Sequence, residues 1–146
     1  MAGPVDYLAA NAALEALFGA QPAQAEGTGS WSPNGSSFSI PSNWSCSATG
    51  RDGAVYFQVC VVRSGNYVQA ATIVNNTGNS QRLVGVDQTP SSSTTTYQSH
   101  VKCAISGVAA KSISVCFSAT AQSSALVRYF ASFDWPWDIY NPSPWA

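Results

Sequence analysis

The sequence predicts an all-β protein: an immunoglobulin-like sandwich of two antiparallel sheets with about seven or eight strands, preceded by an N-terminal α-helix and a linker. Short β-branched and aromatic segments alternate with turn residues at intervals of about 8–12 residues, a spacing typical of sandwiches. Apolar residues make up 45% of the chain and charged residues only 9%. Four cysteines without a CxxC motif indicate a fold held by disulfide bonds.

Length and charge limit the class of protein. The 146 residues suffice for one domain, and 22 Ser and 9 Thr residues supply solubility in place of charges. A net charge of −1 with 6 Lys and Arg residues lacks the basic surface that nucleic-acid binding requires. No window approaches a run of about 18 apolar residues, the length that a membrane-spanning helix needs. We therefore expect neither nucleic acid nor a membrane as a partner.

Residues 1–29 are expected to form an amphipathic helix and a flexible linker. Strong helix formers fill residues 4–19, and Gln21 to Gly35 is rich in Pro, Gly, Ser and Thr. The apolar stripe of the helix includes the candidate partner-binding residues Tyr7, Leu14, Leu17 and Phe18. This stripe packs either on the sandwich of the same chain or on a partner protein.

Residues 30–133 are expected to form the sandwich. The strand candidates are Phe38–Ile40, Trp44–Thr49, 54–62, 67–74, 82–86, 97–106, 112–119 and 125–133. A hairpin about Ser64-Gly65 gives an apolar core face, on which Val55, Phe57, Val59 and Val61 lie opposite Val74, Thr72, Ala70 and Val68. The opposite, more polar face would carry Tyr56, Gln58, Cys60, Gln69 and Tyr67. The Ser/Thr-rich stretch Thr89–Thr96 is expected to be an exposed loop.

The four cysteines allow three disulfide connectivities. Each of the sequence gaps between Cys46 and Cys60 and between Cys103 and Cys116 is centred on a turn signal. If each pair lies on opposite arms of a hairpin, the sulfurs face each other, which favours Cys46–Cys60 and Cys103–Cys116. Disulfide bonds persist in oxidising compartments, so the expected location is extracellular. Ala23-Gln24-Ala25 resembles a signal-peptidase site, but no Lys or Arg precedes it, so we treat this segment as part of the functional protein.

Residues 134–146 are expected to form an extended strap, because three prolines exclude a central strand. The strap carries a candidate aromatic patch of Trp135, Trp137, Tyr140 and Trp145. Such a patch stacks on a glycan if it is exposed, or covers the sandwich as a lid if the strap folds back.

No catalytic residues, metal site or cofactor are predicted. His100 is the single histidine and lies in an ordinary alternating segment without a GxSxG elbow. Asp134 and Asp138 are too close in sequence, on an unsupported strap, for the two carboxylates of a glycosidase. We therefore expect a protein that binds rather than an enzyme.

The stretch from Tyr56 to Ala70, followed by Val74-Asn75-Asn76, resembles small secreted β-sandwich proteins of actinobacteria. Within that set the chain is similar to the small adaptor subunits of umbrella toxin particles. The resemblance implies an extracellular, non-enzymatic adaptor that engages other protein subunits of an assembly, with residues 1–29 and a sheet edge as docking elements. The alternatives are a carbohydrate-binding module that uses the C-terminal tryptophans and a membrane-active, pore-forming-like toxin.

The predicted stripe gives a first test. Replacing Leu14 and Phe18 by Asp should abolish complex formation while the thermal unfolding of the sandwich stays nearly unchanged. This outcome is expected because two charges in the stripe oppose its burial against a partner. A large loss of thermal stability in the double variant would instead place the helix in the core of its own domain.

Overall fold

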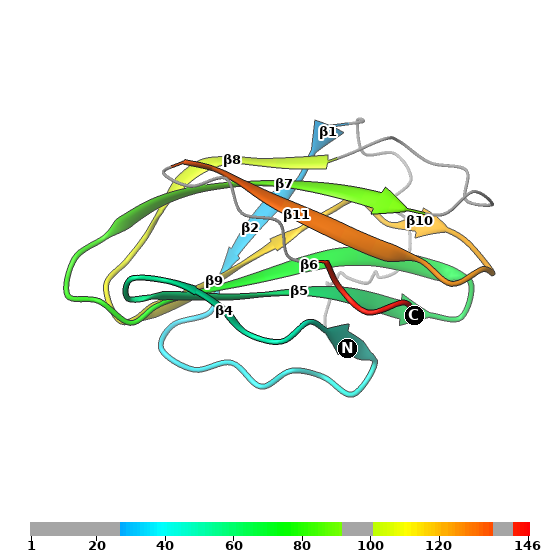
Figure 1. Ribbon diagram of the computed structural model, residues 1–146, viewed down its shortest axis with the longest axis horizontal. Coiled ribbons are helices and arrows are strands. Elements are labelled where there is room, and N and C mark those ends of the chain that lie inside the picture. The colour runs from blue at the N-terminus through cyan, green and yellow to red at the C-terminus, as the bar shows by residue number, and fades with distance from the viewer. Residues whose placement is uncertain (1–26, 92–100, 136–141) are drawn as a thin grey trace.

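The protein is an all-β sandwich of two sheets packed face to face, as Figure 1 shows for the computed structural model, which describes residues 27–91, 101–135 and 142–146. The smaller sheet has the order β1-β8-β7-β11, and its strands are β1 (Gly27–Thr28), β7 (Arg82–Ser91), β8 (Val101–Val108) and β11 (Arg128–Trp135). The larger sheet has the order β2-β9-β6-β5-β3, with β10 beside β6 and β4 beside β5. Its strands are β2 (Ser30–Pro33), β3 (Trp44–Cys46), β4 (Gly50–Asp52), β5 (Val55–Ser64), β6 (Tyr67–Asn76), β9 (Ser112–Phe117) and β10 (Ala121–Gln122). Pairing is antiparallel in both sheets, except that the short β1 runs parallel to β8.

The core lies between the two sheets and is built mainly by the hairpin of β5 and β6. The inward residues of β5, namely Val55, Phe57, Val59 and Val61, are all at most 2% exposed. From the smaller sheet, Val84, Val86 and Phe133 face them and are fully buried. The rings of Phe57 and Phe133 meet across the core with centroids 4.7 Å apart. The predicted core face of this hairpin is therefore confirmed.

The register of the hairpin differs from the predicted one by two residues. Val55 lies opposite Asn76 and Phe57 lies opposite Val74, whereas the sequence analysis placed Val55 opposite Val74. The reason is the turn, which consists of Gly65 and Asn66 between the paired residues Ser64 and Tyr67. Gly65 takes a φ of +60°, which glycine adopts without strain. A shift of two residues keeps every side chain on the predicted face, because the strand period is two.

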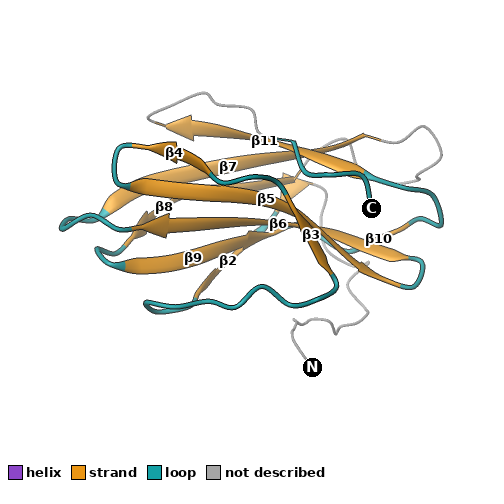
Figure 2. Ribbon diagram, turned by 60° about the horizontal axis from the view of Figure 1, so that its bottom comes forward, coloured by secondary structure: helices purple, strands orange, loops and turns teal. Residues whose placement is uncertain are grey.

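The outer face of the larger sheet is not the polar surface that the sequence predicted. Six buried residues form a second apolar cluster there: Trp44, Cys60, Ala71, Ile73, Ile113 and Val115. The loop that joins β2 to β3 runs along this sheet (Figure 2), and its Phe38 packs against the cluster. The segment Phe38–Ile40, expected as an edge strand, belongs to this loop. The predicted strand Trp44–Thr49 is shorter than expected, because β3 ends at Cys46.

Both predicted disulfide bonds are present, Cys46–Cys60 and Cys103–Cys116. Cys46 and Cys60 lie directly opposite each other on the neighbouring strands β3 and β5. Cys103 and Cys116 lie instead on β8 and β9, which belong to different sheets, so the expectation of a second hairpin disulfide was wrong. The chain crosses between the sheets at the turn after Val108, where Lys111 has a φ of 57°. Two intramolecular disulfides are compatible with an oxidising environment.

The second half of the predicted linker is part of the sandwich. β1 pairs with β8 in the smaller sheet and β2 pairs with β9 in the larger one, so the chain changes sheets at Gly29. A Cβ atom on Gly29 would lie 2.8 Å from the Sγ of Cys103 and 3.1 Å from the carbonyl oxygen of Phe117. Only glycine fits at this crossing. The indole N–H of Trp31 donates to the Ala104 carbonyl at 2.8 Å, which ties β2 to the smaller sheet.

Two further segments differ from, or fall outside, the sequence-based expectations. The stretch Thr89–Thr96, expected as a loop, begins inside β7, which continues to Ser91. The predicted helix over residues 4–19 lies outside the described residues. So does His100.

Three buried serines make the same set of contacts at three interruptions of the strand pairing. The backbone N–H of Ser47 donates to Val59 O, and the backbone N–H of Val59 donates back to the hydroxyl of Ser47, at 2.9 and 3.1 Å. The carbonyl oxygen of Ser47 accepts from the side chain of Gln58 at 2.9 Å. Ser118 repeats this pattern with Ala70 and Gln69, and Ser143 repeats it with Tyr129 and Arg128. Each hydroxyl therefore replaces a backbone acceptor where an extra residue enters the strand.

These contacts give a prediction for stability. Ser47→Ala, Ser118→Ala and Ser143→Ala should each lower the free energy of unfolding by about 1–3 kcal/mol, since each leaves a buried backbone N–H without its acceptor. The measurement is chemical denaturation with the disulfides intact. The matched control is Ser64→Ala at an exposed position, with an expected change within about 0.5 kcal/mol. Equal effects of all four substitutions would refute the role of the buried hydroxyls.

Candidate functional site

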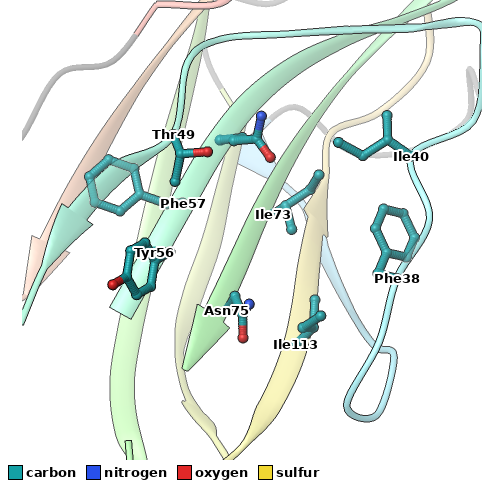
Figure 3. Close-up of a pocket in the computed structure, with 9 residues that line it drawn as sticks. Phe38, Ile40, Thr49, Tyr56, Phe57, Ile73, Asn75 and Ile113 are labelled. Carbon is teal, nitrogen blue, oxygen red and sulfur yellow. The ribbon is translucent and has the colours of Figure 1, made fainter. Parts of the chain in front are cut away.

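The outer face of the larger sheet contains a hollow of about 250 Å³, which we call the outer hollow (Figure 3). Its floor is apolar and includes Ile73 of β6 and Ile113 of β9. Phe38 and Ile40 of the loop between β2 and β3 form one wall, and Thr49 and Tyr56 form the other. The complete lining is Phe38, Ile40, Thr49, Tyr56, Phe57, Gln58, Ile73, Asn75 and Ile113.

Polar groups stand at defined positions around this floor. Tyr56, Asn75 and Ile113 lie side by side across β5, β6 and β9, because Asn75 pairs with both of the others. The amide N–H of Gln58 donates to the carbonyl oxygen of Ser47 at 2.9 Å, which fixes the orientation of the Gln58 carboxamide. Asn75 is half-buried, and its side chain lines the hollow. None of the lining residues carries a charge.

The walls of the outer hollow are held by packing and by a covalent bond. The ring of Phe38 packs on Trp44 with centroids 5.4 Å apart, and Trp44 in turn meets Phe117 edge-on at 5.8 Å. Trp44 begins β3, which the Cys46–Cys60 bond fastens to β5. The loop wall and the sheet floor are thereby fixed relative to each other before any ligand arrives.

The outer face of the smaller sheet is a second candidate surface. Leu83 of β7 is 43% exposed and Ile105 of β8 is 52% exposed. The two are diagonal neighbours, because Leu83 pairs with Gly107. At the other end of the sheet, the guanidinium of Arg128 lies 5.8 Å from the ring centroid of Phe130 and 5.0 Å from that of Trp145. We call this set, Leu83, Ile105, Arg128, Phe130 and Trp145, the outer strip.

The C-terminal segment returns to the sheet along β11. Ser143 N–H donates to Tyr129 O at 2.8 Å, and Ala146 and Val127 exchange two backbone hydrogen bonds at 2.8 and 3.0 Å. The segment is thereby anchored, yet Trp145 remains 47% exposed. The guanidinium of Arg63 also donates to the carbonyl oxygens of Ala146 and Ser123, which ties this segment to the loop before β11.

Of the predicted partner-binding and aromatic-patch residues, two fall within the described part of the chain, as do all four disulfide cysteines. Trp145 does, and Trp135 ends β11 with its backbone opposite Gly85. The helix residues Tyr7, Leu14, Leu17 and Phe18 lie outside it, as do Trp137 and Tyr140. Sequence reasoning missed the outer hollow. The only signal was the run Phe38-Ser39-Ile40, whose apolar residues were assigned to an edge strand.

The described residues contain neither a candidate metal site nor a candidate membrane-spanning helix. No three His, Cys, Asp or Glu side chains in residues 27–91, 101–135 and 142–146 gather closely enough to hold a metal ion. Within the same ranges no helix has the length and apolar character that a membrane crossing demands. Comparisons with protein families, with curated proteins and with solved structures found no match for this chain.

The wall of the outer hollow gives a prediction for dynamics. Phe38→Ala should accelerate amide hydrogen exchange across residues 36–43, because the loop loses its ring contact with Trp44, worth about 0.5–1.5 kcal/mol. Exchange in β5 and β6 should remain slow. The control is Ile40→Ala, an exposed residue of the same loop, which should leave exchange around Trp44 nearly unchanged. If amide hydrogen exchange in Phe38→Ala instead accelerates equally over both sheets, the loop does not open independently of the sandwich.

Proposed function

We propose that this protein is a non-catalytic, protein-binding adaptor module of an extracellular assembly. The observation that carries the proposal is the outer strip. Three of the six large apolar side chains that are exposed in the described residues are Leu83, Ile105 and Trp145. Aromatic and arginine side chains, here Phe130, Trp145 and Arg128, are enriched where proteins bind proteins.

The dimensions of the outer strip suit one partner. Leu83 and Ser91 mark the two ends of the strip along β7, since Arg128 pairs with Ser91. The eight residue steps between them span about 27 Å at about 3.4 Å per residue. A standard interface covers about 800 Å² on each partner, which is about 30 Å across. A single partner protein therefore covers both ends of the strip.

The extracellular location and the immunoglobulin-like class are parts of this proposal. The two disulfide bonds support the location, because such bonds persist outside the reducing cytosol. The buried bond between β8 and β9 joins the two sheets, as the disulfide of immunoglobulin domains does. The resemblance to small adaptor subunits supports the same reading.

The test is a pull-down from the culture fluid of the source organism with the full chain as bait, followed by mass spectrometry. Leu83→Asp and Ile105→Asp should each reduce the recovery of a specific partner at least tenfold, because each places a charge without a counter-charge in a surface that the partner buries. Tyr67→Asp, at an exposed position of β6, is the control and should retain the partner. Undiminished recovery with both strip variants would overturn the proposal, once thermal unfolding shows that the variants are folded.

A further inference from the structure

We propose that the outer hollow is a binding site for one neutral pyranose ring, such as the terminal sugar of a glycan. The site is distinct from the predicted C-terminal tryptophan platform and from the outer strip, because it lies on the larger sheet. It goes beyond the adaptor function, and it does not depend on that function.

The absence of charge in the lining selects a neutral ligand. The nine lining residues are apolar, hydroxylated or amide side chains. A carboxylate, phosphate or ammonium group that entered the hollow would lose hydration without gaining an ion pair. Arg51, a cation beside the lining residue Tyr56, is engaged with the ring of Tyr56 at 5.3 Å and with the carbonyl oxygen of Gly53 at 2.8 Å.

The polar groups match a ring that bears hydroxyl groups. Each hydroxyl donates and accepts one or more hydrogen bonds without a net charge. Asn75 offers both N–H donors and a carbonyl acceptor, and Gln58, with one of its two N–H groups engaged at Ser47, adds a carbonyl acceptor to the lining. The hydroxyl of Thr49 points toward the middle of the hollow (Figure 3). The hydroxyl groups at the edge of a sugar ring can therefore form hydrogen bonds with polar groups of the sheet and of Thr49.

The floor and walls match the faces of such a ring. The C–H face of a pyranose is apolar and packs on aliphatic or aromatic side chains. Ile73 and Ile113 are each only 7% exposed and supply an aliphatic floor between the rings of Phe38 and Tyr56. A purely apolar ligand would pack on this floor. It would also remove the Asn75 amide from water without offering it a hydrogen bond, which costs free energy.

The volume limits the ligand to one ring. Sites for drug-sized molecules occupy about 300–1,000 Å³, and the outer hollow falls below this range at about 250 Å³. A ligand with about 12 non-hydrogen atoms at about 0.3 kcal/mol per atom binds with a Kd in the millimolar range. Tighter binding to a glycan requires several such contacts at once, as on a multivalent surface.

The test adds methyl glycosides of glucose, galactose, mannose and N-acetylglucosamine, one at a time, to the labelled full-length chain and follows it by nuclear magnetic resonance. At least one glycoside should shift the side-chain amide of Asn75 and the methyl groups of Ile73 and Ile113, with saturation at millimolar concentrations. No shift with any glycoside would overturn the proposal. Shifts caused only by indole, an apolar ring, or only by glucose 6-phosphate, a charged sugar, would also overturn it.

Two variants and one control locate the site. Asn75→Ala should weaken binding at least tenfold, and Thr49→Trp should abolish it by filling the hollow from an exposed position. Tyr67→Ser, at the far end of β6, should bind as the wild type does. If Asn75→Ala and Thr49→Trp bind the glycoside as well as the Tyr67→Ser control does, the sugar binds elsewhere. Leu83→Asp should leave glycoside binding unchanged, so failure of the adaptor proposal and failure of this one are distinguishable.

Discussion

The disulfide bond between Cys103 and Cys116 fixes the distance between the two sheets, and much of the remaining structure depends on that distance. Both cysteines are fully buried among core residues from both sheets. By closing a loop of 13 residues, the bond contributes about 3 kcal/mol through the entropy of the unfolded chain. Gly29 crosses from one sheet to the other directly beside the sulfur of Cys103, where a Cβ atom would lie only 2.8 Å from that sulfur.

The interior also contains a polar contact between the sheets. The hydroxyl of Thr72 on β6 donates to Oε1 of Gln88 on β7 at 2.6 Å, and both residues are fully buried. Among the described residues, Nε2 of Gln88 has no hydrogen-bond partner, which costs about 1–3 kcal/mol. Such a contact discriminates between relative positions of the sheets, which valines alone do not. The core thus combines a covalent link, an apolar filling and one directional bond.

Three of the many serines have a defined structural role, because they make the same repeated set of buried contacts. The hydroxyl accepts a hydrogen bond from a backbone N–H in each contact, at Ser47, Ser118 and Ser143, where the regular strand pairing is interrupted. The contact at Ser47 also orients Gln58 toward the outer hollow, and the contact at Ser143 brings Trp145 to Arg128. The same local hydrogen-bond pattern of a serine therefore contributes to both candidate surfaces. The two candidate surfaces lie on different sheets, so a ligand on one does not cover the other.

The sequence by itself determined the strand class, the core face of the central hairpin and the pairing of Cys46 with Cys60. These follow from period-two patterns such as Val55 to Val61 and from turn residues between the cysteines, which are local properties of the chain. Tertiary structure alone decided that Cys116 faces Cys103 across the core, that Phe38 covers the larger sheet, and that residues Gly27–Pro33 form strands. The physical reason is that Gly-rich and Ser-rich segments have little preference of their own, so their conformation is set by the distant surfaces on which they pack.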